Sequence, residues 1–336
     1  MRKLVAILGA GALVWAALAL PGTAQSTGMT WKVAIGGETP DHAVQAQDYF
    51  PRTIAINAGD SITWTMAAEF PHTVTFLSGA KRPEIVLPQG KDRFLFNPVV
   101  VFPQGGKEYA GKGIASSGFV EGKGKSYALA FTKPGNYTYV CLLHPGHTGT
   151  VIVRPKGTTI TRTQADYDKM AEKQLAQALQ QGQKLLASAK PAMSKGTKGA
   201  VHTVPLPGSA AARVSIIRFV PENLTVKVGD TVRWVMQDPQ EIHTVTFIGG
   251  TDKPPEFVTP EPQAQGPPKI YFNPKVVVPL GGATYKDEGY HNSGILMPPG
   301  VPGPKAYALT FTKPGTYGYW CIVHVPQGMK GIITVR

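Results

Sequence analysis

The sequence has little cysteine, little charge and only one long apolar run, and each shortage excludes a class of protein. Two cysteines among 336 residues are too few for a disulfide framework. Charged side chains make up 16% of the chain and hydrophobic ones 42%, which excludes a charge-rich disordered protein. Beyond the run Leu4–Leu20, no segment approaches the length of a membrane span. The composition therefore indicates a folded protein that is long enough for two domains.

Glycine and proline are plentiful, with 38 and 30 residues, and no G-x-y period carries them. They are typical of turns between the strands of an all-β protein rather than of collagen. Lysine and arginine exceed aspartate and glutamate, which gives a formal net charge of +13. Such a surface is expected to attract acidic proteins or anionic lipid.

The first residues have the pattern of an export signal. Arg2 and Lys3 precede the apolar run, and small residues up to Ala24 offer a cleavage site. We therefore expect residues 1–24 to be a signal peptide and the mature protein to be periplasmic or secreted, without membrane association. The alternative is that the run is retained as a membrane anchor.

An internal repeat organises the rest of the chain. The repeated segments are FTKPGNYTYVC at 131–141 with FTKPGTYGYWC at 311–321, and HTVTF at 72–76 and again at 243–247. These landmarks follow in the same order in both copies, which indicates a duplicated domain. We expect one domain over 29–155 and the other over 201–336. Alternation of apolar and polar residues and frequent turn signals predict short strands and a β-sandwich in each.

The connection over 156–200 has a different pattern. Its apolar residues recur at helical spacing, at Tyr167, Ala171, Leu175, Leu179 and Leu186. Thr163 and Asp166 resemble a capping box, so we expect a basic linker with one amphipathic helix over about 163–189. A flexible tether is expected at 194–199. The helix is expected to pack on a sandwich; a helix on a membrane surface is the alternative.

The C-terminal copy contains a set of metal-ligand side chains. Cys321, His324 and Met329 lie in one short loop, and His243 comes from a distant segment. A thiolate, two imidazoles and a weak thioether form the ligand set of a blue-copper site. In the N-terminal copy the thiolate and imidazoles recur as His72, Cys141 and His144.

The chain resembles cupredoxins of the plastocyanin and amicyanin kind over both repeats. The motifs are Glu241-Ile-His243-Thr-Val-Thr-Phe247, Lys313-Pro-Gly-Thr-Tyr-Gly-Tyr-Trp-Cys321 and the C-x-x-H-x-x-x-x-M loop. The resemblance implies an all-β chain of two Greek-key cupredoxin β-sandwich domains joined by a helical linker. It also implies one copper ion in each domain, with the loop histidines His144 and His324 presenting an imidazole edge at an apolar surface. By the same resemblance, Met329 is a long axial ligand and the other three are equatorial.

The N-terminal copy departs from this family at one position. In amicyanin-like short loops the third residue after the loop histidine is methionine, whereas here it is His147. Three interpretations are open: an axial copper ligand, a surface histidine beside three-coordinate copper, or a site that prefers zinc or no metal. As a ligand, His147 would favour Cu(II) and lower the potential. A disulfide between Cys141 and Cys321 is a further alternative, but both occupy the same ligand position, so we expect free thiols.

The expected function is that of an exported electron carrier, not an enzyme, which passes single electrons between redox proteins. Copper nitrite reductases and multicopper oxidases, the enzymatic alternative, place a histidine beside the copper cysteine. Here the flanking residues are Val140 and Leu142 in one copy and Trp320 and Ile322 in the other. Copper storage or delivery is a third possibility. Partners with acidic docking surfaces are expected, and nucleic acid is not.

Three histidines have no cysteine partner and are not expected to be ligands. They are His42, His202 and His291. We expect the first two to be exposed and the third to lie in a loop.

Overall fold

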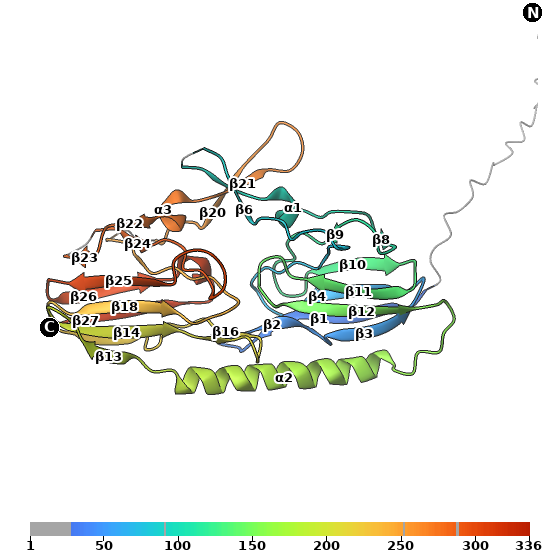
Figure 1. Cartoon of the computed structure of the whole chain (residues 1–336), viewed down its shortest axis with the longest axis horizontal. Helices are drawn as coiled ribbons and strands as arrows, with labels where there is room; N and C mark the ends of the chain where they lie inside the picture. Colours follow the sequence, from blue (N-terminus) through green and yellow to red (C-terminus); the bar gives the residue numbers. More distant parts are fainter. Residues whose placement is uncertain (1–27, 91, 251–252, 287–288) are drawn as a thin grey trace, which may run out of the picture.

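The computed structural model describes residues 28–90, 92–250, 253–286 and 289–336, so the expected export signal at 1–24 lies outside the described residues. Within the described ranges, the strands form five sheets. Two sheets build each of two sandwiches, which lie side by side along the longest axis of the molecule, and the fifth joins them (Figure 1). None of the described helices is both long and apolar enough to cross a membrane.

The first sandwich contains the strands of the N-terminal repeat. One layer is formed by β1 (Thr30–Glu38), β2 (Val44–Phe50), β4 (Ser61–Met66), β8 (Glu108–Tyr109) and β10 (Ser126–Phe131). The other is formed by β3 (Thr53–Asn57), β5 (Thr75–Phe76), β9 (Ala115–Ser116), β11 (Gly135–Val140) and β12 (Thr148–Arg154). Because β1 pairs in parallel with β4 and β3 with β12, neighbours in space are not neighbours in sequence, as the Greek-key prediction requires.

The second sandwich repeats this arrangement. One layer is formed by β13 (Ala192–Lys195), β14 (Ala200–Leu206), β18 (Thr231–Met236), β23 (Thr284–Tyr285) and β25 (Ala306–Phe311). The other is formed by β17 (Asn223–Val226), β19 (Thr246–Phe247), β22 (Pro279–Leu280), β24 (His291–Ser293), β26 (Gly315–Trp320) and β27 (Lys330–Val335). Three short helical turns, α1 (Pro98–Val101), α3 (Pro274–Val277) and η1 (Ile322–His324), lie in the connections. The predicted two-domain β-sandwich fold is confirmed.

Equivalent aromatic residues fill the two cores. Trp64 packs edge-on against Tyr139 with ring centroids 5.4 Å apart, and Trp234 packs against Tyr319 at 5.2 Å. All four side chains are fully buried. The alternation seen in the sequence places these large rings between the layers, where each contributes a large buried apolar area.

The predicted linker helix is present as α2 (Gln164–Ser188), and it runs beneath both sandwiches (Figure 1). The capping box is formed: the Thr163 side chain accepts from the Asp166 N–H, and the Asp166 carboxylate accepts from the Thr163 N–H. The apolar face of α2 packs on β2 of the first domain and β16 (Val214–Ile216) of the second. At Gly182 the helix approaches so closely that an added Cβ would lie 2.2 Å from Val44 Cγ1.

The predicted flexible tether at 194–199 is wrong. Residues 192–195 form β13, which pairs antiparallel with β14, and the Gly196 N–H donates to the Gly199 carbonyl at 2.8 Å. Every residue of β13 is exposed, so no alternation of apolar residues marks this edge strand in the sequence.

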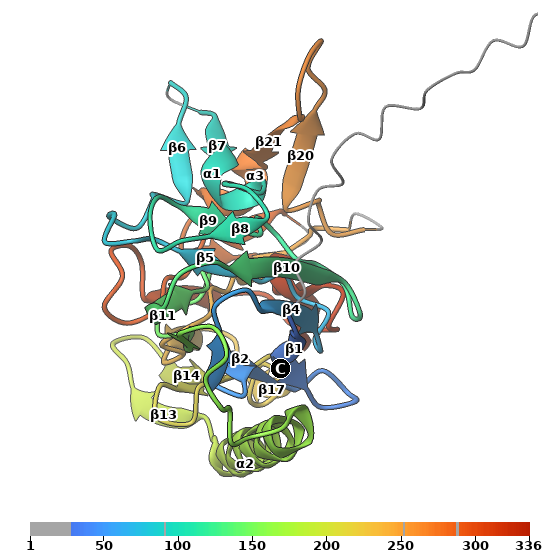
Figure 2. The ribbon, with the colours of Figure 1, turned by 90° about the vertical axis from the view of Figure 1, so that its right-hand side faces the viewer.

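Two strand pairings join the domains. β2 pairs antiparallel with β16, and β16 pairs in turn with β15 (Gly208–Ser209), which precedes it in the chain. On the opposite side of the molecule the fifth sheet contains β6 (Val86–Pro88), β7 (Phe94–Phe96), β20 (Val258–Glu261) and β21 (Lys269–Phe272). There β7 of the first domain pairs with β21 of the second (Figure 2).

Both pairings follow one approximate twofold relation. In the repeats, Val44 corresponds to Val214 and Ala46 to Ile216. In the sheet, Val44 pairs with Ile216 and Ala46 pairs with Val214, so the pairing stays the same when the two repeats are exchanged. Phe96 stacks on its own equivalent, Phe272, with ring centroids 4.4 Å apart. The two domains therefore meet through the same surface of each repeat, as the subunits of a twofold dimer do.

Candidate metal centres

Each domain gathers its predicted ligands in one buried cluster. The cluster of the first domain consists of His72, Cys141, His144 and His147. That of the second consists of His243, Cys321 and His324. Within each cluster the ligand atoms all lie within 4.8 Å of one another. Among the described residues, these are the groups of three or more such side chains that are close enough to hold a metal.

The two clusters have nearly the same geometry. The cysteine follows β11 in the first domain and β26 in the second, and its thiol sulfur lies 3.3 Å from Nδ1 of the loop histidine in both. Nδ1 of the more distant histidine lies 3.8 Å from Cys141 Sγ and 3.7 Å from Cys321 Sγ. A backbone N–H donates to each sulfur, from Thr73 at 3.4 Å and from Thr244 at 3.3 Å. The sandwich thus holds the soft sulfur and two imidazole nitrogens around one point, without a disulfide.

His147 and Met329 occupy the same place in the two loops. The Cys141 N–H donates to the His147 carbonyl at 2.9 Å, and the Cys321 N–H donates to the Met329 carbonyl at 3.0 Å. Both side chains are fully buried. The structure therefore aligns His147 with Met329 although the first loop is shorter.

The side chain of His147 is fully buried. Its exposed fraction is 0%, and among the described residues neither Nδ1 nor Nε2 has a hydrogen-bond partner. Its ring lies 4.1 Å from the ring of Tyr49 and 4.9 Å from that of His72, measured between centroids. The interpretation of His147 as a surface histidine is wrong. A buried, unpaired imidazole next to a thiolate fits a metal ligand, because an unsatisfied polar group is otherwise unfavourable there.

The ionisation of the first cluster is dominated by one ion-paired histidine. Burial alone would lower the pKa of His144, but the negative charges of Glu241 and Cys141 outweigh burial and raise it to about 10. Burial would raise the pKa of Cys141, but the charge of His144 and the hydrogen bonds from the surrounding histidines together outweigh burial and hold the pKa well below its usual value. Burial lowers the pKa of His72 to about 4. The cluster therefore favours a thiolate and a neutral His72, which are the forms that bind a metal, whereas His144 would release its Nδ1 proton when a metal binds.

The more distant histidine of the second cluster, His243, has its own acidic neighbour. Asp238 Oδ2 lies 3.9 Å from His243 Nε2, and both side chains are fully buried. Burial would lower the pKa of His243, but the interactions with Asp238 and with Cys321 together outweigh burial and raise the pKa. The corresponding segment before His72 contains Ala67 and Ala68 instead.

The two clusters face each other across the domain interface. Oε2 of Glu241 lies 2.9 Å from His144 Nε2 and 3.8 Å from His324 Nε2. The ring of Phe70 packs against both histidines, at 5.8 and 5.0 Å between centroids. His144 is 1% exposed and His324 0%. The expectation that these histidines present an edge at the protein surface is therefore wrong, because the other domain covers them.

A cleft between the domains, of about 980 Å³, reaches His144 and Glu241 from outside. Its walls are mainly apolar, and they include Phe70, Phe96, Phe257 and Phe272. The described lining residues contain Glu69, Glu121 and Glu256 but neither lysine nor arginine. The cleft is therefore acidic, in contrast to the net charge of the chain.

Sequence reasoning did not assign a role to Glu241, Asp238 or Phe70. One signal was present: the residue two positions before the first histidine is Phe70 in one repeat and Glu241 in the other. A charged residue at a position that is aromatic in the sister repeat indicates a local function. Its partner, His144, belongs to the other domain, and no local pattern indicates that contact.

The remaining histidines do not join either cluster. His42 is partly exposed and lies 3.1 Å from Glu38. His202, which was expected to be exposed, is 14% exposed and pairs with Asp230 at 3.0 Å. His291 lies in β24, with Nε2 3.2 Å from the Thr284 carbonyl oxygen.

Comparison with known proteins gives a consistent result for both repeats. The profile of copper-binding proteins of the plastocyanin/azurin family matches residues 41–154 and 209–336. A plastocyanin from Scenedesmus fuscus is 31% identical over 118 residues, which are 35% of this chain and 86% of that protein. A chloroplastic plastocyanin from Tetradesmus obliquus is 30% identical over 106 residues, 31% of this chain and 57% of that protein. Amicyanin from Paracoccus denitrificans is 26% identical over 129 residues, 38% of this chain and 66% of that protein.

Among solved structures, the Cu(I) form of an amicyanin variant matches with 21% identity and a TM-score of 0.24. The match covers 44% of this chain and 94% of that one. In each of the three named relatives, the matched stretch of 106 to 129 residues is about as long as one repeat of this chain.

Proposed function

The chain belongs to the plastocyanin/azurin family of copper-binding proteins, and from this premise we propose that it is an exported carrier of single electrons with one copper site in each domain. The observation that supports the proposal best is the repeated cluster, with a cysteine sulfur 3.3 Å from a histidine Nδ1 in both domains. Copper bound there supplies reversible one-electron oxidation and reduction. We assign the domains to residues 29–155 and 201–336, with the linker over 156–200, whose strand β13 adds to the edge of the second sandwich.

The proposed ligands are the side chains gathered in the clusters and the two equivalent loop residues. They are His72, Cys141, His144 and His147 in the first domain, and His243, Cys321, His324 and Met329 in the second. The donor set of thiolate and imidazole is one that suits copper. The N–H groups of Thr73 and Thr244 are already directed at the sulfur atoms, so little reorganisation is needed on binding.

Burial of both loop histidines requires another route for electrons to a partner. Trp320 directly precedes Cys321, is partly exposed, and has the Lys330 ammonium 5.6 Å from its ring centroid. We propose that a partner with an acidic docking surface binds over these two residues. The interdomain cleft, whose described lining is acidic, is the less suitable place for such a partner.

The alternatives have less support. The enzymatic one would require a histidine beside the copper cysteine, where this chain has Val140 and Leu142 in one repeat and Trp320 and Ile322 in the other. Copper delivery requires release to a recipient, whereas both clusters are buried under the opposite domain.

The test uses the full chain supplied with Cu(II), followed by optical and electron paramagnetic resonance spectra. The proposal predicts two copper ions per chain that cycle reversibly and pass electrons to an acidic redox protein. Lys330→Glu should slow that transfer, while Lys195→Glu, an equal charge change on the exposed edge strand β13, should leave it unchanged. Transfer of copper itself to an apo-protein, without electron transfer, would overturn the proposal in favour of copper delivery.

A further inference from the structure

Glu241 lies where the two domains and the two clusters meet. It follows β18 of the second domain, but its closest charged neighbour is His144 of the first domain, at 2.9 Å. His324, the loop histidine of its own domain, lies 3.8 Å from the same oxygen. One carboxylate oxygen therefore faces the outer nitrogen of both loop histidines.

The Glu241 side chain is held firmly in this position. It is 2% exposed, and its Oε1 accepts the Ile242 N–H at 2.8 Å. Oε2 also accepts from Gln47 Nε2 of the first domain at 3.4 Å. The backbone N–H of Glu241 donates to Asp238 Oδ1 at 3.1 Å, which fixes the turn before the second cluster. A buried carboxylate is stable only when its charge is compensated, and here the compensating group is on the other domain.

The contact determines which nitrogen of His144 faces the metal centre. Nε2 donates its proton to Glu241, and Nδ1 lies 3.3 Å from Cys141 Sγ. A carboxylate that accepts from the outer nitrogen of a ligating histidine orients the ring and makes it a stronger donor. At His324 the same oxygen is 0.9 Å farther away, at 3.8 rather than 2.9 Å, so its effect should be weaker there.

We infer that Glu241 is a positioning residue shared by the two centres: supplied by the second domain, it orients His144 in the first and links that centre to His324. The inference rests on the proposed function insofar as it treats the clusters as metal sites. It predicts that the first centre depends on the second domain for part of its metal affinity. Because one carboxylate oxygen faces both loop histidines, occupation of one centre should also change the affinity of the other, and by thermodynamic reciprocity the effect is equal in both directions.

The test compares three variants of the full chain. Glu241→Ala removes both the charge and the acceptor, Glu241→Gln retains an acceptor of similar shape, and Gln240→Ala is the matched control. Gln240 is the adjacent buried residue and donates from Nε2 to the Pro145 carbonyl of the first domain at 3.2 Å, without touching a loop histidine. A general weakening of the interface would therefore affect Gln240→Ala as well.

Two measurements are needed. The first is hydrogen exchange of the His144 Nε2–H, observed by nuclear magnetic resonance in the metal-free and zinc-bound chain. We expect protection in the wild type and Gln240→Ala, partial protection in Glu241→Gln, and none in Glu241→Ala. The second is copper affinity, which Glu241→Ala should weaken about 10–100-fold at the first centre, the range found for lost outer partners of metal ligands, and less at the second.

The outcomes separate the inference from the proposed function. If the wild type binds two copper ions but Glu241→Ala matches Gln240→Ala in exchange and in affinity, the inference alone is overturned. If the wild type binds no copper, the proposed function fails, while exchange in the metal-free chain still tests the positioning of His144. If Glu241→Ala does not fold, the partial loss expected for Glu241→Gln decides, and full wild-type protection and affinity in that variant would contradict the role of the charge.

Discussion

The two centres have the same inner geometry and different surroundings. In both, the loop histidine lies 3.3 Å from the cysteine sulfur, and a threonine N–H donates to that sulfur. The differences are at the fourth position, His147 against Met329, and in the acidic partner, which is Asp238 for His243 and has no counterpart before His72. Duplication thus preserved the thiolate and imidazole frame, and the residues around it diverged. This pattern is the one expected if the two sites hold the same metal at different potentials.

The largest effect is expected from removing one thiolate at a time. Cys321→Ser should abolish the intense visible band of the second centre and leave that of the first, and Cys141→Ser should do the reverse, because the thiolate supplies the charge transfer. Optical spectra of the full chain with added Cu(II) provide the measurement. A centre that keeps its band after loss of its cysteine would show that its ligands are wrongly assigned.

The next largest effect, on stability, concerns two equivalent interface positions that carry opposite charges, Asp48 in the first repeat and Arg218 in the second. Asp48 is fully buried and pairs with Arg52 and with Arg213 of the other domain, whereas the equivalent Arg218 pairs with the half-exposed Glu222 at 3.3 Å. Asp48→Asn leaves two guanidinium groups without their carboxylate and should lower the free energy of unfolding by about 2–3 kcal/mol. Glu222→Gln should lower it by less than about 0.5 kcal/mol. Chemical denaturation of both variants measures the difference, and equal losses would contradict the comparison.

Exchanging the residues at the fourth position, His147 and Met329, should shift the redox potentials of the two centres in opposite directions. Imidazole favours Cu(II) more than a thioether does, so His147→Met should raise the potential of the first centre and Met329→His should lower that of the second. A tenfold change in preference between the oxidation states corresponds to about 59 mV for one electron, and we expect at least this shift. Redox titration of each variant in the full chain measures it. An unchanged potential in His147→Met would indicate that His147 does not bind the metal.

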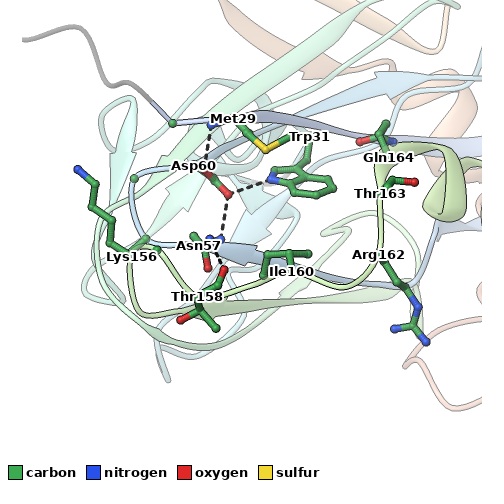
Figure 3. A pocket seen from close by; sticks show the side chains of 14 residues that line it. Met29, Trp31, Asn57, Asp60, Lys156, Thr158, Ile160, Arg162, Thr163 and Gln164 are labelled. Atoms are coloured by element: carbon green, nitrogen blue, oxygen red, sulfur yellow. Dashed lines mark hydrogen bonds between the residues drawn. The ribbon is translucent and has the colours of Figure 1, made fainter.

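The smallest effect is a pH-dependent change in stability at Asp230, whose equivalent in the first domain, Asp60, has a different partner. Asp60 accepts from Trp31 Nε1 at 3.0 Å in the first domain (Figure 3), and Asp230 lies 3.0 Å from His202 Nε2 in the second. Burial would raise the pKa of Asp230, but hydrogen bonds from the Lys227 N–H and from His202 lower it below 3.8. Its contribution to stability is therefore present above that value and is lost as the pH falls through the lowered pKa.

Asp230→Asn should accordingly lower the free energy of unfolding by about 1 kcal/mol at neutral pH. The difference from the wild type should disappear once Asp230 is protonated in the folded protein. Unfolding curves at a series of acidic pH values test this expectation. A difference that persists unchanged at the lowest pH would mean that packing, not the carboxylate charge, is responsible.

Much of the fold is encoded in patterns that repeat locally. The helix expected over 163–189 is observed as Gln164–Ser188, because an apolar face and a capping box are properties of one segment. The clustering of one cysteine and two histidines in each domain was likewise predictable, since HTVTF and the cysteine loop recur in each repeat. The burial of His147 was not predictable, because a short polar loop gives no indication of its depth.

The interface between the domains could not be predicted from the sequence. The pairing of β2 with β16 joins segments that are far apart in the chain. The pattern of apolar and polar residues in each strand is the same whether its edge is free or paired with a strand of the other domain. The position of Glu241 beside His144 is a consequence of that pairing. For the same reason, isolated domains would expose strands and a carboxylate that are paired in the intact chain, so single-cysteine variants of the full chain are the better probes of each centre.

The most direct test of the account is a redox titration of the full wild-type chain with two copper ions bound, with each centre assigned by the Cys141→Ser and Cys321→Ser variants. The account predicts two separable one-electron steps, the one at lower potential belonging to the first centre, where His147 stands in place of Met329. A single copper per chain, or a potential of the first centre equal to or above that of the second, would contradict it.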